Sequence, residues 1–291
     1  MNTDAASAPF IEVENLRVFL PTGDKSEIEA VHRVDLVVRD GERVGLVGES
    51  GSGKSVTGRA IAGLLPTSPR VRVSGSIRIA GREMVGAPRE AWDEVRRSHV
   101  GMIFQDPLTF LNPTMRVGDQ VAESIPRSRE GDRTQAVHGF LRQAGLEDAP
   151  RVAASFPHEL SGGMRQRALI AIAIAKLPSL VIADEPTTAL DATVQARVLK
   201  TLDETVSQLK TSLVLISHDL AVVAGMTDRL YVMYSGRIVE EGPTEQVLQD
   251  PQHPYTKALL RSVRSLTAPG VELYSISPQL RRELAEAMTD A

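Results

Sequence analysis

The chain has 291 residues, and its 33 lysines and arginines against 37 acidic residues give a formal charge of −4. This length is enough to bury a core without cross-links, and the balance of charge argues against a nucleic-acid binder that neutralises phosphates over its whole surface. The absence of cysteine excludes disulfides, thiolate metal sites, iron–sulfur clusters and cysteine nucleophiles.

No targeting segment or membrane span is recognisable in the sequence. Residues 1–9 lack the basic stretch and apolar core of a secretory signal. The longest uninterrupted apolar run, residues 168–175, stops at Lys176, whereas a helix that crosses a bilayer needs about 20 apolar residues. We therefore expect a cytoplasmic protein that reaches a membrane only through a partner.

The N-terminal part combines two kinds of strand pattern. Residues 11–14 and 75–79 alternate between apolar and polar side chains, which predicts half-exposed antiparallel strands. Between them, residues 43–47 form a short apolar run closed by a glycine-rich turn, and apolar residues then recur at helical spacing from 56 to 65. We expect a small β layer beside a buried strand, loop and helix.

The middle and C-terminal parts alternate helices with buried strands. Between about residues 108 and 159 the chain is more polar, with repeated prolines and helical apolar spacing, which predicts an inserted helical subdomain at about 107–166. Residues 180–183 and 213–216 have the length and composition of buried strands, so a largely parallel sheet covered on both faces is expected. A hairpin is expected around Ser235, then a helical segment broken by Pro251 and Pro254.

Residues 48–55, Gly-Glu-Ser-Gly-Ser-Gly-Lys-Ser, fit the pattern G-x-x-x-x-G-K-[ST] between a strand and a helix. Glycines let backbone N–H groups converge on phosphate oxygens, and a helix N-terminus adds positive potential. Lys54 would reach the β- and γ-phosphates, and the Ser55 hydroxyl would bind Mg²⁺. The alternative is that a glycine-rich turn matches this pattern by chance. The nucleotide-binding set predicted here is Gly48, Ser50, Gly51, Ser52, Gly53, Lys54, Ser55 and Val56.

Two further segments point to the same chemistry. The apolar strand 180–183 ends in Asp184, suited to Mg²⁺ through water, and Glu185, placed to polarise an attacking water. Such an ending is common in strands and is weak by itself. Residues 160–167, Leu-Ser-Gly-Gly-Met-Arg-Gln-Arg, form a second serine-glycine turn that opens a helix, for which a structural cap is the alternative.

Taken together, these segments resemble the ABC ATPases, with Walker A, Walker B and a signature motif in the family's order. The resemblance identifies Gln105 as the Q-loop residue, with expected roles in Mg²⁺ binding and catalysis. It identifies Asp191 as the D-loop residue and His218 as the switch histidine, a catalytic residue near the γ-phosphate. Alone, His218 is better explained as a satisfied histidine at a strand end, and Gln105 carries almost no information; the order and placement of the motifs reverse both judgements.

The resemblance implies an α/β fold: a RecA-like P-loop NTPase core, an N-terminal antiparallel β layer and an inserted α-helical subdomain. The expected ATPase domain spans residues 9–265, with the helical subdomain at about 107–166 and a tail at 266–291. In this family two such domains meet head to tail, so Ser161, Gly162 and Gly163 of one domain would face the ATP held by the other. Only one motif set is present, so a second ATPase subunit, a distinct homologue, is expected.

The resemblance extends to ATP subunits of oligopeptide, dipeptide and nickel importers, over about residues 11–264. It rests on residues 104–107 with 111–113, residues 156–159, and residues 252–256. It implies two permease subunits, an extracytoplasmic solute-binding protein, no nucleic acid, and a place on the cytoplasmic face of the inner membrane. The cofactors would be ATP and Mg²⁺.

Three departures from the family pattern stand out. The adenine-stacking aromatic expected before the first loop aligns with Leu20, so Phe19 beside it is our candidate. The cysteine-bearing C-terminal extension of many members is absent after Arg264. No function is therefore expected to be inherited by residues 267–291.

Two other classes remain as alternatives. A soluble ABC ATPase acting on DNA or ribosomes would usually carry long coiled coils, zinc-binding cysteines or two cassettes, and none of these is in the sequence. A small-molecule kinase could use the same P-loop, but the signature and His218 would then be unexplained.

Overall fold

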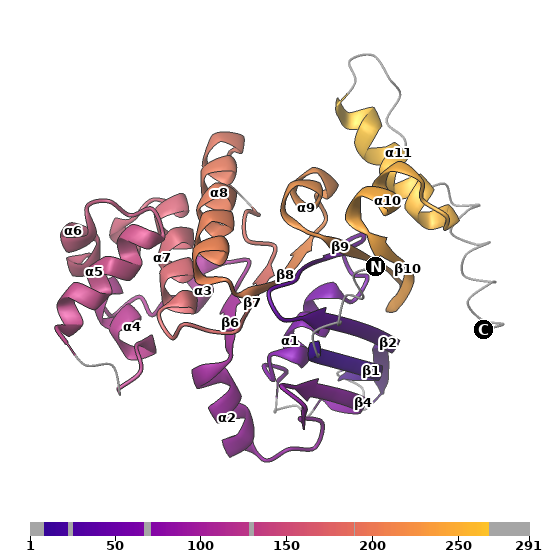
Figure 1. Ribbon diagram of the computed structural model, residues 1–291, viewed down its shortest axis with the longest axis horizontal. Helices are drawn as coiled ribbons and strands as arrows, with labels where there is room; N and C mark the ends of the chain where they lie inside the picture. The colour runs from indigo at the N-terminus through magenta and orange to yellow at the C-terminus, as the bar shows by residue number, and fades with distance from the viewer. Residues whose placement is uncertain (1–8, 23–25, 67–70, 128–130, 189, 268–291) are drawn as a thin grey trace, which may run out of the picture.

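The structure is a computed structural model that describes residues 9–22, 26–66, 71–127, 131–188 and 190–267 (Figure 1). The N-terminal layer is an antiparallel sheet in the order β2-β1-β4-β5. Its strands are β1 (Pro9–Pro21), β2 (Glu27–Arg39), β4 (Arg72–Ile79) and β5 (Arg82–Glu83). The expected β layer is therefore present, but its first strand is longer than residues 11–14 suggested, and β2 was not predicted.

The second sheet has the order β10-β9-β3-β8-β7-β6. Strands β9, β3, β8, β7 and β6 are parallel, and only β10 runs antiparallel, as the second strand of a hairpin with β9. The bounds are β3 (Arg43–Val47), β6 (Val100–Ile103), β7 (Leu180–Asp184), β8 (Ser212–Ser217), β9 (Arg229–Tyr234) and β10 (Arg237–Pro243). The predicted parallel sheet and the hairpin around Ser235 are both confirmed.

Both faces of the parallel sheet are covered. On one face, apolar side chains of the antiparallel sheet, α1 (Lys54–Ile61) and α2 (Arg89–Ser98) pack against β3, β7 and β8. On the other face lie α7 (Gly162–Ile174), α8 (Ala192–Leu209) and α9 (Leu220–Met226), with α10 (Thr244–Gln249) and α11 (Pro254–Thr267) beside them. Helix α1 ends at Ile61, earlier than the apolar spacing suggested, because Gly63 follows in the left-handed region at φ 64°.

The helical subdomain lies on the α7 side, away from the antiparallel sheet (Figure 1). It consists of α3 (Pro107–Phe110), α4 (Val117–Ser124), α5 (Arg133–Gln143), α6 (Ala149–Ala154) and the 3-10 turn η1 (Pro157–Glu159). Its core, which includes Val121, Phe140 and Leu141, is continuous with the core beneath α7. No helix in the described ranges is long and apolar enough to cross a membrane.

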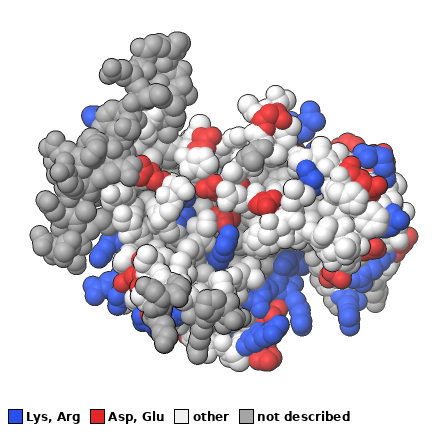
Figure 2. Space-filling view, turned by 180° about the vertical axis from the view of Figure 1, so that it is seen from behind, with Lys and Arg blue, Asp and Glu red and all other residues white. Residues whose placement is uncertain are grey.

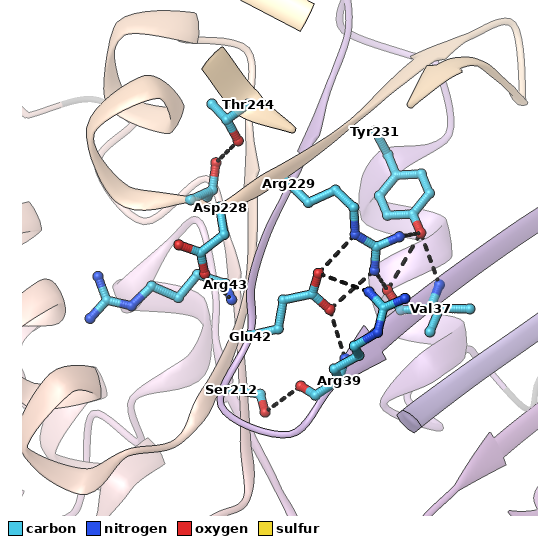
Figure 3. A network of polar contacts seen from close by, with 10 residues as sticks. Val37, Arg39, Glu42, Arg43, Ser212, Asp228, Arg229, Tyr231 and Thr244 are labelled. Atoms are coloured by element: carbon cyan, nitrogen blue, oxygen red, sulfur yellow. Dashed lines mark hydrogen bonds and ion pairs between the residues drawn. The ribbon is translucent and has the colours of Figure 1, made fainter. Parts of the chain in front are cut away.

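A polar network ties the two sheets together behind β3 (Figure 3). Arg229 on β9 donates to both carboxylate oxygens of Glu42, at 2.8 and 3.1 Å, and to the Val37 carbonyl of β2 at 2.7 Å. The hydroxyl of Tyr231 accepts from the Val37 N–H at 3.1 Å. Burial raises the pKa of Glu42, but the hydrogen bonds from Arg229 and the Arg39 backbone outweigh it and hold that pKa below its ordinary value. The carboxylate is thus kept ionised as a fixed link between the sheets.

The strand order sets the position of the functional segments. The loops that follow β3, β8, β7 and β6 leave the same edge of the sheet, because these strands are parallel neighbours. They carry the P-loop, His218, the pair Asp184 and Glu185, and Gln105 in turn. Segments far apart in the sequence therefore meet at one edge, which is where open α/β sheets bind ligands.

Candidate nucleotide site

The P-loop surrounds the side chain of Lys54. Gly53 precedes α1 in the left-handed region at φ 102°, and a Cβ there would meet the Ala30 carbonyl oxygen at 2.6 Å, so only glycine fits. The Lys54 ammonium donates to the carbonyl oxygens of Gly48 at 2.9 Å and Glu49 at 2.7 Å. Burial lowers the pKa of Lys54, although Glu185, Asp184 and Glu49 act against it. The loop therefore holds a partly desolvated cation, which a phosphate would stabilise.

Ser55 and Asp184 form the next part of the site. The Ser55 hydroxyl donates to Asp184 Oδ1 at 2.7 Å. Asp184 is completely buried, and its Oδ2 has no hydrogen-bond partner among the described residues. Burial raises the pKa of Asp184 despite the hydrogen bond from Ser55. A hydroxyl and a carboxylate whose buried Oδ2 accepts no hydrogen bond from the described residues suit a hard cation such as Mg²⁺, so the residues fit the expected metal.

The three residues predicted to be catalytic lie close together, because Gln105 and His218 both contact the carboxylate of Glu185. Gln105 Nε2 donates to Glu185 Oε2 at 3.2 Å, and His218 Nδ1 lies 3.3 Å from Glu185 Oε1. Glu185 itself has φ 46°, an unfavourable backbone conformation for this residue type, and its N–H donates to the Ile216 carbonyl at 2.9 Å. The strained turn after β7 thus aims the carboxylate between the ends of β6 and β8. Gln105 faces Glu185 through its amide nitrogen.

The signature turn is built as a helix start. Ser161 is the N-cap of α7 and accepts from the Met164 N–H at 3.4 Å. A Cβ on Gly163 would meet Val194 Cγ1 at 2.3 Å, so glycine lets α7 approach α8 closely. Ser161 is exposed, and the contacts of Gly162 and Gly163 are with Leu190 and Val194. The turn therefore packs against the D-loop segment and presents its serine to solvent.

Asp191 and Phe19 are placed outside the carboxylate cluster. Asp191 is the N-cap of α8 and accepts from the Val194 N–H at 3.0 Å. Phe19 lies on β1, half-buried, and the Arg72 guanidinium covers its ring at 3.6 Å from the centroid. The Arg17 guanidinium also lies over this ring, 5.2 Å from its centroid, so an adenine ring at Phe19 would compete with two arginines.

Sequence reasoning missed two residues beside the site. Thr188 Oγ1 donates to Glu185 Oε2 at 2.9 Å, and Arg59 Nη2 lies 3.8 Å from Asp184 Oδ2. Arg59 is four residues after Ser55 on α1, so its helical spacing could have placed it on the same face. Nothing in the sequence around Thr188 indicated its contact.

Comparisons with known proteins identify the family of this chain. Residues 31–188 match the family described as ABC transporter, and residues 239–288 match the family described as oligopeptide/dipeptide transporter, C-terminal region. The second match crosses residue 265 and corrects our expectation that the resemblance ends near residue 264 and leaves the tail without inherited character. The tail beyond residue 267 lies outside the described residues.

Individual relatives are similar over most of the chain. The oligopeptide transport ATP-binding protein OppD of Bacillus subtilis is 43% identical over 272 residues, which cover 92% of this chain and 75% of that protein. The dipeptide transport ATP-binding protein DppD of Lactococcus lactis is 41% identical, with coverage of 93% and 78%.

Solved structures show the same fold. A dimeric ATP-binding cassette in a post-hydrolysis state, bound to ADP and Pi, superimposes with a TM-score of 0.71 at 27% identity, covering 80% of this chain and 98% of that one. The fold of this chain is thus shared with a cassette that binds nucleotide. The chain belongs to the ABC transporter family and is one of its ATP-hydrolysing, nucleotide-binding subunits.

Proposed function

We propose that this subunit powers the uptake of oligopeptides or dipeptides, or of a related small solute such as nickel, through separate permease subunits. The observation that carries the proposal is the convergence of Lys54, Asp184, Glu185, Gln105 and His218 at one sheet edge. The names of the relatives, oligopeptide and dipeptide transport ATP-binding proteins, support the class of solute.

ATP would be held by the P-loop set from Gly48 to Val56, with Phe19 as the candidate neighbour of the adenine. Lys54 would exchange the carbonyl oxygens of Gly48 and Glu49 for phosphate oxygens. Ser55 and Asp184 would hold Mg²⁺, with Gln105 as a further ligand through its amide oxygen. When bound, the cation neutralises charge on the transferring phosphoryl group.

Glu185 would act as the general base that polarises the attacking water. Its carboxylate is oriented by Gln105 and Thr188 and lies beside His218, so three neighbours from different loops fix its position. Phosphoryl transfer depends mainly on such positioning and on electrostatic stabilisation. The His218 side chain, which is exposed, would contact the γ-phosphate from the opposite side of the carboxylate.

The complete site needs a second ATPase subunit, which we propose to be a distinct homologue in a head-to-tail dimer. The exposed Ser161, with Gly162 and Gly163, would close over the partner's ATP, and Asp191 would lie at the shared interface. The dimeric state of the similar cassette bound to ADP and Pi supports this arrangement.

The permeases would dock beside the Q-loop, on the cytoplasmic face of the inner membrane. Helix α3 follows Gln105 directly and exposes Leu108 by 57% and Phe110 by 43%. A cavity of about 810 Å³ lies between α2 and the end of α4, and four basic side chains line it together with Asp93 and Glu123. The four basic residues are Arg96, Arg97, Arg127 and Lys176. Lysine and arginine side chains in general gather along the lower edge of the molecule in Figure 2. A solute-binding protein outside the membrane would act through the permeases.

We further propose that residues 9–265 act as a single ATPase domain with the helical subdomain inserted at about 107–166, followed by the tail at 266–291. In this arrangement Gln105 stands at the boundary between the sheet and the helical subdomain. A rotation of the helical subdomain on ATP binding would then move both Gln105 and α3.

The test is Mg·ATP turnover of the chain assembled in lipid with its permeases and partner ATPase, with and without solute-loaded binding protein. Turnover that rises with the binding protein and collapses in Glu185→Gln would support the proposal. Turnover that ignored the permeases and responded to DNA or ribosomes would instead favour a soluble ABC ATPase, and a phosphorylated small-molecule product would indicate a kinase.

A further inference from the structure

The segment Gln-His-Pro-Tyr-Thr at residues 252–256 is docked on β10 by a set of local contacts. The backbone N–H groups of Gln252 and His253 donate to the Glu240 carboxylate at 2.6 and 3.0 Å. His253 Nδ1 accepts from the Tyr255 N–H at 3.2 Å, and the His253 carbonyl accepts from the Lys257 N–H at 3.1 Å. Pro254 begins α11, where a missing N–H costs nothing. These contacts give the segment one fixed position.

Tyr255 reaches from this segment to the P-loop. It is fully buried, and its ring lies 4.4 Å from that of Tyr234, the last residue of β9. Its hydroxyl oxygen accepts a hydrogen bond of 2.9 Å from the backbone N–H of Glu49. Strand β9 neighbours β3, and the P-loop follows β3 directly. A residue 206 positions later in the chain is thereby bonded to the loop expected to hold phosphate.

The peptide unit between Gly48 and Glu49 is therefore bonded at both of its polar ends. Its carbonyl oxygen accepts from the Lys54 ammonium at 2.9 Å, and its N–H donates to Tyr255. A rotation of this peptide would break both hydrogen bonds at once. Gly48 sits at φ 155° without a side chain to restrain it, so these two bonds help to fix the plane of the peptide.

We propose that Tyr255 is a positioning residue for nucleotide binding, which fixes the Gly48–Glu49 peptide and through it the P-loop around Lys54. The inference rests on the nucleotide-binding role of the P-loop and assigns a part in it to the C-terminal region. A preorganised loop loses less freedom when ATP binds than a loop that must first be ordered. Removing the hydroxyl leaves the Glu49 N–H without this partner and lets the peptide rotate.

The variant Tyr255→Phe removes one oxygen and keeps the ring against Tyr234. The matched control is Tyr231→Phe, because Tyr231 is also buried and its hydroxyl also accepts from a backbone N–H, that of Val37 on β2 (Figure 3). Both variants lose a tyrosine hydroxyl, and only Tyr255→Phe removes a contact with the P-loop. We would measure the Kd for Mg·ATP of each full-length chain, and KM and kcat in the assembled transporter.

The expected result is a Kd and KM for ATP raised about three- to tenfold in Tyr255→Phe, as the loss of one hydrogen bond implies, with kcat within about twofold of wild type. Tyr231→Phe should lower thermal stability and leave the Kd unchanged. Equal Kd values in Tyr255→Phe and wild type, or equal shifts in both variants, would overturn the proposal.

Amide hydrogen exchange gives an answer that does not depend on a variant folding. In the nucleotide-free wild-type chain the Glu49 N–H should be protected from exchange, since it is hydrogen-bonded to a buried hydroxyl. Rapid exchange at Glu49 would contradict the inference. If the wild-type chain failed to bind ATP at all, the nucleotide-binding role itself would fall, which is a distinct outcome from a Tyr255 variant that binds ATP normally.

Discussion

His218 Nδ1 lies 3.3 Å from Glu185 Oε1, so a histidine after β8 and a glutamate after β7 meet across neighbouring parallel strands. On its other oxygen the same carboxylate accepts from Gln105 and Thr188. The residue proposed to polarise the attacking water, Glu185, and the residue proposed to contact the γ-phosphate, His218, would then belong to one cluster of polar contacts. Replacing any of these three neighbours should therefore shift the Glu185 carboxylate.

Replacing Glu185 by Gln should lower kcat in the assembled transporter by about 10²- to 10⁴-fold, because the general base is lost. ATP binding should change little, since the P-loop contacts of Lys54 remain. Steady-state ATP turnover and equilibrium nucleotide binding would be measured together. Glu204→Gln, the same change at an exposed residue of α8, serves as control and should behave as wild type. A Glu185→Gln variant with near-normal kcat would remove this residue from the chemistry.

Replacing Asp184 by Asn should raise the Mg²⁺ concentration needed for half-maximal turnover by about 10- to 100-fold. The buried Oδ2, which has no hydrogen-bond partner among the described residues and lies 3.8 Å from Arg59 Nη2, is the feature that points to a cation. Titration of Mg²⁺ after chelation would give the value. Asp203→Asn changes an aspartate that pairs with Arg43 and should leave the Mg²⁺ dependence untouched. An unchanged Mg²⁺ requirement in Asp184→Asn would refute the assignment.

The sequence located the phosphate and carboxylate motifs because each is a short local pattern tied to a strand end. Parallel strands then bring separate strand ends to one edge, so the closeness of Glu185 and His218 followed from the expected fold. Gln105 follows β6, a strand that the sequence pattern did not predict, and was identified only through the family resemblance. Strand β2 was missed because its pairing with β1 contains several register shifts, which interrupt a clean alternation along residues 27–39. The boundary of α1 was misjudged because two leucines after Gly63 continued the apolar spacing.

Contacts between distant residues had no local signal. The bond between Tyr255 and Glu49 joins residues 206 positions apart, and only the docking of residues 252–256 on β10 creates it. The Arg72 guanidinium over Phe19 depends likewise on the pairing of β1 with β4. Such contacts arise from tertiary packing. A motif search therefore identifies the residues of the site but not the distant residues that hold them in place.

The pair of Arg229 and Glu42 should contribute to stability in a pH-dependent way. Arg229→Met removes the closest cation from the mostly buried Glu42 carboxylate, which keeps only its contacts with Arg39, and should lower the free energy of unfolding by about 2 kcal/mol near pH 7. Since the folded pKa of Glu42 is lowered, its contribution is fully present above the unfolded value and is lost as pH falls through the folded one. Denaturant unfolding between pH 7 and 4 would measure both effects.

The control for that pair is Arg72→Met, which removes a more exposed ion pair with Glu27. Surface pairs of this kind contribute little, so the change should stay below about 1 kcal/mol. Should the two variants prove equally stable, the network of Figure 3 would not be a significant tie between the sheets.

His253 should make stability sensitive to mild acid. Burial lowers the pKa of His253, and its neutral Nδ1 accepts from the Tyr255 N–H, a bond that protonation at Nδ1 abolishes. A base with a lowered folded pKa binds protons more readily when unfolded, so its contribution is complete above about pH 6.5 and declines as pH falls towards the folded pKa. His253→Asn keeps an acceptor for the helix start and does not titrate in this range. The wild type should therefore lose more thermal stability than this variant between pH 7.5 and 5.5. Parallel losses in the two proteins would show that the pH sensitivity arises at other histidines.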